Sequence, residues 1–184
     1  MKILHIMPHL GGGVGKAHAS LCAVMPAEVE QTFLLLEEPR DRRYADAIAA
    51  SGSTVRVAGD LDEVARRAAT ADVVQIEFWN HPRLFQCLAR TKFPAIRTVF
   101  WSHVSGLFKP VIAPTLIAGA GRFVFTSEAS LTIASLANAT HERISVIDSA
   151  FGFTPQGSER ADSEIPRLTY LGTVHCYQGD LDNA

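Results

Sequence analysis

The chain has 184 residues and a net charge of −2 at neutral pH, with 47% hydrophobic and 20% charged residues. These values are ordinary for a globular domain, the charge predicts no general attraction to nucleic acid, and no apolar run reaches the ~20 residues that a transmembrane helix needs. Cys22, Cys87 and Cys176 form no CxxC pair, which favours a cytoplasmic location over a secreted disulfide framework.

Apolar runs of strand length alternate with helical segments along the chain. Strands are expected at residues 2–8, 31–36, 53–59, 71–79, 95–103, 122–127 and 144–151. Helices are expected at residues 16–25, 41–50, 60–69, 81–90, 111–118 and 128–138. Asp60 is a good N-cap for its helix, with Glu63 three residues later. The alternation predicts right-handed crossovers and a doubly wound parallel sheet of the Rossmann type, a three-layer α/β/α domain.

The pattern changes after residue 153. Residues 154–166 (TPQGSERADSEIP) are polar and rich in charge, which is typical of a linker. Residues 167–184 begin with RLTYLGTV, which looks like a new strand. We therefore expect a first domain at 1–153, a linker at 154–166 and, at 167–184, either the start of a second domain or a strand that docks on the first.

The segment LGGGVGKA follows the first expected strand. It resembles two nucleotide-binding motifs but matches neither. A P-loop needs glycine where Leu10 stands and a hydroxyl residue where Ala17 stands. A dinucleotide fingerprint needs glycine at Lys16 or at His18, and without it Glu37 or Glu38 is a weak candidate for a ribose-binding acid. Two interpretations stay open: a loop that presents backbone N–H groups to an anion, and a tight turn that needs positive φ.

A series of motifs resembles a known family. In order they are ILHIMPHLGGGVGKAHASL, VVQIEFW, VFWSHVSG, RFVFTSEAS, RISVIDSAFGF and RLTYLGTV. Together they look like the N-terminal domain of a GT-B glycosyltransferase of the retaining family 4 type (glycosyltransferases group 1). The resemblance implies transfer of a sugar from a nucleotide-sugar donor to a sugar or lipid-linked acceptor, without a metal or another cofactor. It also implies a donor-binding C-terminal domain in cis, so that this chain alone is expected to be inactive.

The resemblance assigns roles to particular residues. Gly12, Gly13, Val14 and Gly15 match the glycine-rich segment that lies against the donor phosphates and the acceptor in relatives. His103 matches a histidine that contacts the donor sugar, and we expect it to be the catalytic residue of this domain. Residues at other strand ends are expected to bind the acceptor: Glu77, Trp101, Ser127 and Glu128.

Several of these side chains also have a structural interpretation, and His103 could instead be a surface histidine or a core histidine with satisfied hydrogen bonds. Glu77 could instead cap the helix expected at 81, and Ser127 is an equally good N-cap. The resemblance departs from the family at residues 148–153, where the asparagine of the usual Asn-Gly is absent. No metal site is expected, since His5, His9 and His18 are scattered in the sequence. Lys16 and His18 are expected in the first turn of a helix, where a cation favours an anionic ligand nearby.

Residues 78–110 combine aromatic side chains with Lys and Arg and contain no Asp or Glu. Such a stretch could contact anionic lipid head groups at a membrane surface. Alternatively, its aromatic residues belong to the core and its cations form a solvated face. Two other functions stay open: a nucleotide-sugar epimerase of the same architecture, and a non-catalytic α/β binding module.

Overall fold

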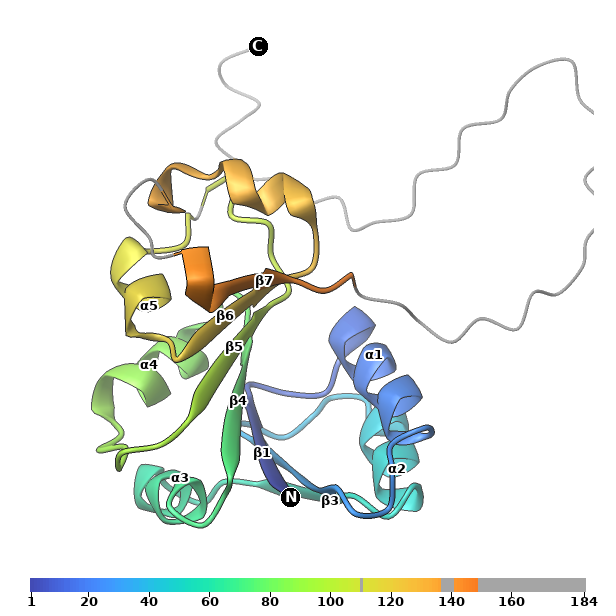
Figure 1. The fold of residues 1–184 in the computed structure, drawn as a ribbon. Helices are drawn as coiled ribbons and strands as arrows, with labels where there is room; N and C mark the ends of the chain where they lie inside the picture. Colours follow the sequence, from blue (N-terminus) through green and yellow to red (C-terminus); the bar gives the residue numbers. More distant parts are fainter. Residues whose placement is uncertain (110, 137–140, 149–184) are drawn as a thin grey trace, which may run out of the picture. The chain divides into compact units, whose positions relative to one another are not determined.

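The apolar runs form one seven-stranded sheet in the computed structural model, which describes residues 1–109, 111–136 and 141–148 (Figure 1). The strands are β1 (Lys2–Met7), β2 (Glu30–Leu35), β3 (Thr54–Val57), β4 (Val73–Phe78), β5 (Thr98–Ser102), β6 (Arg122–Phe125) and β7 (Ile144–Val146). Their order is β3-β2-β1-β4-β5-β6-β7, and every neighbouring pair is parallel. The predicted doubly wound sheet of the Rossmann type is therefore confirmed. The expected linker and the strand after it lie outside the described residues.

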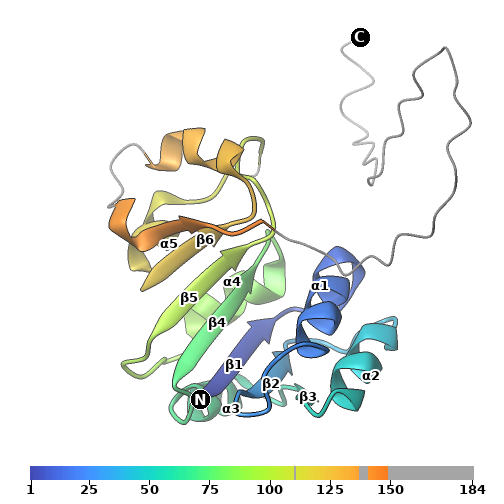
Figure 2. The ribbon, with the colours of Figure 1, turned by 45° about the vertical axis from the view of Figure 1, so that its right-hand side comes forward.

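Helices cover both faces of the sheet (Figures 1 and 2). They are α1 (Gly12–Cys22), α2 (Arg43–Ala50), α3 (Leu61–Ala68), α4 (Pro82–Arg90) and α5 (Pro114–Gly119). Helices α1 and α2 lie on one face, and α3, α4 and α5 lie on the other. As predicted, Asp60 caps α3, where its carboxylate accepts the Glu63 N–H at 2.7 Å. The helix predicted at 128–138 is wrong, because short 3₁₀ turns at Glu128–Thr132 and Ala134–Leu136 replace it.

The alternation of side chains along each strand separates two interiors. On β1, Leu4 and Ile6 join the larger apolar core under α3, α4 and α5. Met7 joins a smaller core under α1 and α2, together with Phe33 of β2. His5 lies on the same face as Met7 and stacks on Phe33, with ring centroids 4.3 Å apart. The face under α1 therefore mixes apolar and polar side chains, and it holds the candidate site.

The glycine segment is mostly helix rather than loop. Helix α1 begins at Gly12, four residues before the predicted start, and Gly12 has φ +57°. The N–H of Gly15 already donates to the Gly11 carbonyl at 3.2 Å. Lys16 and His18 consequently lie in the second turn, so the argument that first-turn cations indicate an anion is wrong. The N–H groups of the first turn still point toward the carboxyl edge of the sheet.

The structure divides the aromatic residues of 78–110 between core and surface. Phe78 and Phe100 are buried, which fits the core interpretation. Phe85 and Phe108 are exposed, and Phe108 retains 82% of its accessible surface. Next to Phe108, Leu107 and Val111 are also exposed. Within the described residues, no helix is long and apolar enough to cross a membrane.

Replacing Gly15 with alanine is expected to lower the free energy of unfolding by about 1–3 kcal/mol, the usual cost of overpacking. A Cβ at Gly15 would lie 2.5 Å from the Leu10 carbonyl oxygen and 2.8 Å from Tyr44. Urea unfolding measures the effect. The matched control is Gly119→Ala in α5, where nothing lies within 4 Å of the new Cβ. Equal stability of the two variants would contradict the close packing of α1.

Candidate functional site

A fully buried carboxylate lies at the carboxyl end of β4. Glu77 is the second-last residue of this strand, and its side chain has no exposed surface. Its neighbour across the sheet is Trp101 of β5, and both side chains lie on the face covered by α1. The alternative in which Glu77 caps the next helix is wrong, since the His81 side chain caps α4. A buried carboxylate is unfavourable unless hydrogen bonds and charges compensate it, so its partners define the site.

Three side chains form hydrogen bonds with the Glu77 carboxylate. Gln75 Nε2 donates to Oε1 at 2.7 Å, and His5 Nδ1 lies 3.1 Å from the same oxygen. His103 Nε2 lies 2.8 Å from the other oxygen, Oε2. The His103 backbone N–H also donates to the Phe78 carbonyl at 2.8 Å. His103 is thus fixed by its backbone and by its ring, and a carboxylate acceptor places the ring proton on Nε2.

A third imidazole reaches the same carboxylate from α1. His18 Nε2 lies 3.1 Å from Glu77 Oε1, and the His18 side chain is 1% exposed. The two atoms do not align as a hydrogen bond, so Nε2 is a buried nitrogen without a hydrogen-bond partner in the described part of the chain. The His18 ring packs edge-on against the rings of His5 and Trp101, at centroid distances of 5.1 and 5.5 Å.

A polar chain continues from this cluster toward α1. His5 Nε2 lies 3.1 Å from Gln31 Oε1, and Gln31 Nε2 lies 3.6 Å from Cys22 Sγ. Gln31 and His5 come from neighbouring strands, and Cys22 ends α1. Every member of this chain is buried. The cluster therefore extends beneath α1 from β2 to β5 as one internal polar layer.

The surroundings set the charge of two members of this layer. Burial alone would raise the pKa of Glu77, but attraction to His18 and the hydrogen bonds from His103 and His5 hold that pKa well below its ordinary value. Burial also lowers the pKa of His5 below 6.5, against the opposing influence of Glu77. Glu77 is thus a carboxylate at neutral pH, and His5 is neutral.

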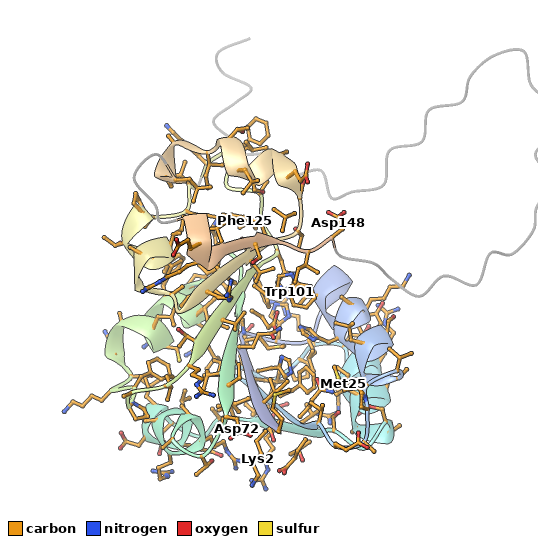
Figure 3. The ribbon with its side chains drawn as sticks, in the orientation of Figure 1. Lys2, Met25, Asp72, Trp101, Phe125 and Asp148 are labelled. Atoms are coloured by element: carbon orange, nitrogen blue, oxygen red, sulfur yellow. The ribbon has the colours of Figure 1, made fainter. Side chains whose placement is uncertain are left out.

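The structure brings together some of the predicted site residues and leaves others apart. Glu77, Trp101 and His103 form one cluster, and the centroids of the Trp101 and His103 rings are 5.0 Å apart. In Figure 3, Trp101 lies between the sheet and α1, away from Lys2 and Asp72 at the opposite edge. Ser127 and Glu128 are exposed, and the Ser127 hydroxyl accepts the Ala129 N–H at 3.3 Å. The N-cap interpretation of Ser127 is therefore confirmed.

Sequence reasoning missed His5, Gln31 and Gln75, and it judged His5 and His18 too scattered to act together. The topology corrects this, because β1, β2 and β4 are adjacent in the sheet. A signal was present in the sequence for two of them: His5 and Gln75 stand between apolar residues of their strands. The parallel register places His5 opposite Gln75 on β4 and opposite Phe33 on β2, two residues along the strand from Gln31.

A second cluster of polar side chains lies near the carboxyl edge of the sheet. His9, Glu37 and His81 offer ligand atoms within 4.8 Å of one another and line a hollow of about 540 Å³. Gly11 N–H donates to His9 Nδ1 at 3.0 Å, and Arg83 N–H donates to His81 Nδ1 at 3.2 Å. Because each Nδ1 accepts a hydrogen bond, each neutral ring carries its own proton on Nε2. Both rings are therefore hydrogen-bond donors, and His81 Nε2 lies 3.6 Å from Glu37.

These features define the described part of the chain as a Rossmann-like α/β domain with a buried carboxylate–histidine cluster at the carboxyl edge of its sheet. No protein-family model matches the chain, and no curated protein matches it significantly. The solved structures that are similar to it include the following three, all at low sequence identity.

The first is saccharopine dehydrogenase from Saccharomyces cerevisiae, with 22% identity and a TM-score of 0.38 over 67% of this chain and 26% of that one. The second is a hypothetical protein from Streptococcus mutans, SMU.573, with 14% identity and a TM-score of 0.49 over 81% of this chain and 59% of that one. The third is AibC, with 14% identity and a TM-score of 0.37 over 80% of this chain and 34% of that one.

The chain thus spans between 26% and 59% of the length of these structures. None of the three is described as a glycosyltransferase. At these TM-scores the likenesses carry no argument about activity.

The free energy of unfolding is expected to fall as the pH drops below 6.5, when it is measured in a buffer containing EDTA. The unfolded chain protonates His5 near 6.5, whereas burial lowers the folded pKa, so the unfolded state binds more protons. Each extra proton contributes a slope of at most about 1.4 kcal/mol per pH unit. Glu77 contributes a further decrease in the free energy of unfolding below about pH 4.5, because its pKa in the folded protein is also lowered.

Urea unfolding between about pH 8 and pH 5 measures this slope. The control is His5→Asn, in which the contribution of His5 to the slope is absent. Equal stability of the wild-type protein at the two ends of this range would contradict a neutral, buried His5.

Proposed function

We propose that this chain is the acceptor-side domain of a retaining glycosyltransferase with the GT-B architecture. The observation that carries the proposal is the pairing of His103 with Glu77 at adjacent strand ends, beside the glycine-rich start of α1. In the family that the sequence resembles, the histidine and the glycine segment at these positions face the donor sugar and its phosphates. A donor domain in cis and a nucleotide-sugar substrate are parts of this proposal.

The geometry of His103 suggests how it would act. Its Nε2 proton is directed at the Glu77 carboxylate at 2.8 Å, so the other ring nitrogen, Nδ1, is the one that can accept a proton. A sugar hydroxyl can donate to Nδ1, and the carboxylate keeps the ring in the orientation that receives it. Glu77 itself has no exposed surface. Its burial favours a positioning role through His103, while the direct acceptor contact predicted for it stays a prediction.

The glycine segment supports the proposal through the start of α1. No acidic side chain lies in the first turn of α1, and Gly11 gives the helix no side-chain cap. Orphan N–H groups at such a position can stabilise negative charge as it develops on a leaving diphosphate. In this proposal the phosphates are brought there by the donor domain.

Within residues 78–110, we propose that the lipid contact is made by the segment around Phe108. Phe108 is 82% exposed, and Leu107 and Val111 beside it are exposed as well. Lys109 between them supplies a positive charge. Apolar side chains with an adjacent cation suit an anionic membrane surface, where a lipid-linked acceptor would be found.

The test is a donor screen with the full-length protein that contains these residues. Release of nucleoside diphosphate from a panel of nucleotide sugars is followed with and without a cell-derived acceptor fraction. The proposal expects release that depends on the acceptor. Interconversion of the sugar without an acceptor would indicate an epimerase, and failure to bind or turn over any nucleotide sugar would overturn the transferase proposal.

His103→Ala is expected to lower turnover about 100-fold or more, in the range seen when a polar group that stabilises the transition state is removed. The matched control is His81→Ala, which removes an imidazole that does not contact Glu77. Turnover by the His103 variant equal to that of the control would exclude His103 from the chemistry. Circular dichroism confirms that both variants fold.

A further inference from the structure

We propose that His5, His18 and Glu77 bind one divalent transition-metal ion of the zinc class, buried beneath α1. The inference does not depend on the glycosyltransferase proposal. Its ligand atoms would be His5 Nδ1, His18 Nε2 and Glu77 Oε1, which come from β1, α1 and β4. Two imidazole nitrogens and one carboxylate oxygen are a donor set that Zn²⁺ and its neighbours accept.

The distances suit a single ion. His5 Nδ1 and His18 Nε2 each lie 3.1 Å from Glu77 Oε1, and all three atoms lie within 4.8 Å of one another. Ligands about 2.0–2.1 Å from a tetrahedral zinc ion are about 3.3–3.4 Å from one another. A small adjustment of side chains would therefore place the three atoms around one centre.

The number of nitrogens around Glu77 Oε1 favours a bound metal ion over hydrogen bonds alone. Three nitrogens crowd this oxygen, from Gln75 at 2.7 Å and from His5 and His18 at 3.1 Å. A carboxylate oxygen has two lone pairs, so it cannot accept three good hydrogen bonds. With a metal ion present, one lone pair accepts the Gln75 N–H and the other binds the ion that His5 and His18 share. This arrangement also gives a bond to His18 Nε2, which is otherwise buried 3.1 Å from Glu77 Oε1 without a hydrogen bond among the described residues.

The neighbours of His5 provide the outer support that metal-binding histidines usually have. His5 Nε2 faces Gln31 Oε1 at 3.1 Å, and an amide oxygen can only accept. In the metal-bound form the ring proton would therefore lie on Nε2, and Nδ1 would direct its lone pair at the ion instead of donating to Glu77. A metal-bound histidine commonly donates its other N–H to a carbonyl or carboxylate in this way. On the far side, His103 Nε2 donates to Glu77 Oε2 and orients the carboxylate.

The same reasoning excludes the second histidine group as a metal site. His9 Nδ1 and His81 Nδ1 both accept backbone N–H groups, so their Nε2 atoms carry protons. Metal binding through Nε2 would require each ring to give up its hydrogen bond. This group therefore supplies matched control variants, with histidines that are near the same edge and should not bind.

A competing arrangement needs no ion. If the Gln31 amide is turned, its NH₂ group donates to His5 Nε2, and His5 Nδ1–H then donates to Glu77. His18 would still lie against an oxygen that already accepts from Gln75 and His5. The experiment separates the two arrangements, because only one of them predicts stoichiometric metal.

The experiment uses the 184-residue chain, stripped of metal with a chelator and then titrated with Zn²⁺ or Co²⁺. Bound metal is measured by mass spectrometry after desalting, and the Co²⁺ form is examined by electronic absorption. We expect one equivalent per chain, a tetrahedral Co²⁺ spectrum without thiolate bands, and a higher melting temperature with metal. His18→Asn is expected to weaken binding at least about 100-fold, whereas His81→Asn should bind like the wild-type protein.

A second variant keeps the proposal testable if His18→Asn does not fold. Gln31→Ala leaves all three ligands in place. It is expected to lower the affinity for the metal about 10–100-fold, as loss of an outer-shell partner does. Cys176→Ser controls for binding by a cysteine outside the described residues and should leave the stoichiometry and affinity unchanged. The absence of stoichiometric metal in the wild-type chain would overturn the proposal, as would binding that His81→Asn abolishes and His18→Asn retains.

Discussion

The organisation of the carboxyl edge depends on one constraint, the burial of an ionised carboxylate. Glu77 has no contact with solvent, yet its pKa is held well below its ordinary value. Such a group is tolerated only when neighbouring donors and charges replace the water it has lost. The Glu77 carboxylate therefore holds side chains from β1, β4, α1 and the end of β5 around it. These contacts align α1 over the sheet and fix the His103 ring.

The fold followed from the sequence because apolar runs and crossovers leave few alternatives. Strand–helix alternation predicted the parallel sheet, and Asp60 marked a true helix start. The helix predicted at 128–138 was wrong because apolar spacing alone did not reveal the turns that interrupt it. The start of α1 was misplaced because glycines usually signal a loop, whereas Gly12 to Gly15 continue directly into the helix.

The candidate site was only partly visible in the sequence. His103 and Glu77 could be singled out because each stands at the end of an apolar strand. Their 2.8 Å contact depends on the register of β4 and β5, which local patterns do not encode. His5, Gln31 and Gln75 could not be joined to the site until the strand order placed β1 between β2 and β4. The proposed sugar chemistry and the proposed metal ion both use Glu77, the first through His103 and the second through Oε1.

The most direct measurement of the central claim is the free energy of unfolding of Glu77→Gln at neutral pH, compared with Glu38→Gln at an exposed position. If the buried carboxylate organises its neighbours, Glu77→Gln should cost about 3–5 kcal/mol, as breaking a buried charge pair does, while Glu38→Gln should stay within about 0.5 kcal/mol of the wild-type protein. The imidazole ¹⁵N signals of His5, His18 and His103 should shift together in the first variant. Unchanged stability and unchanged imidazole signals in Glu77→Gln would contradict the account.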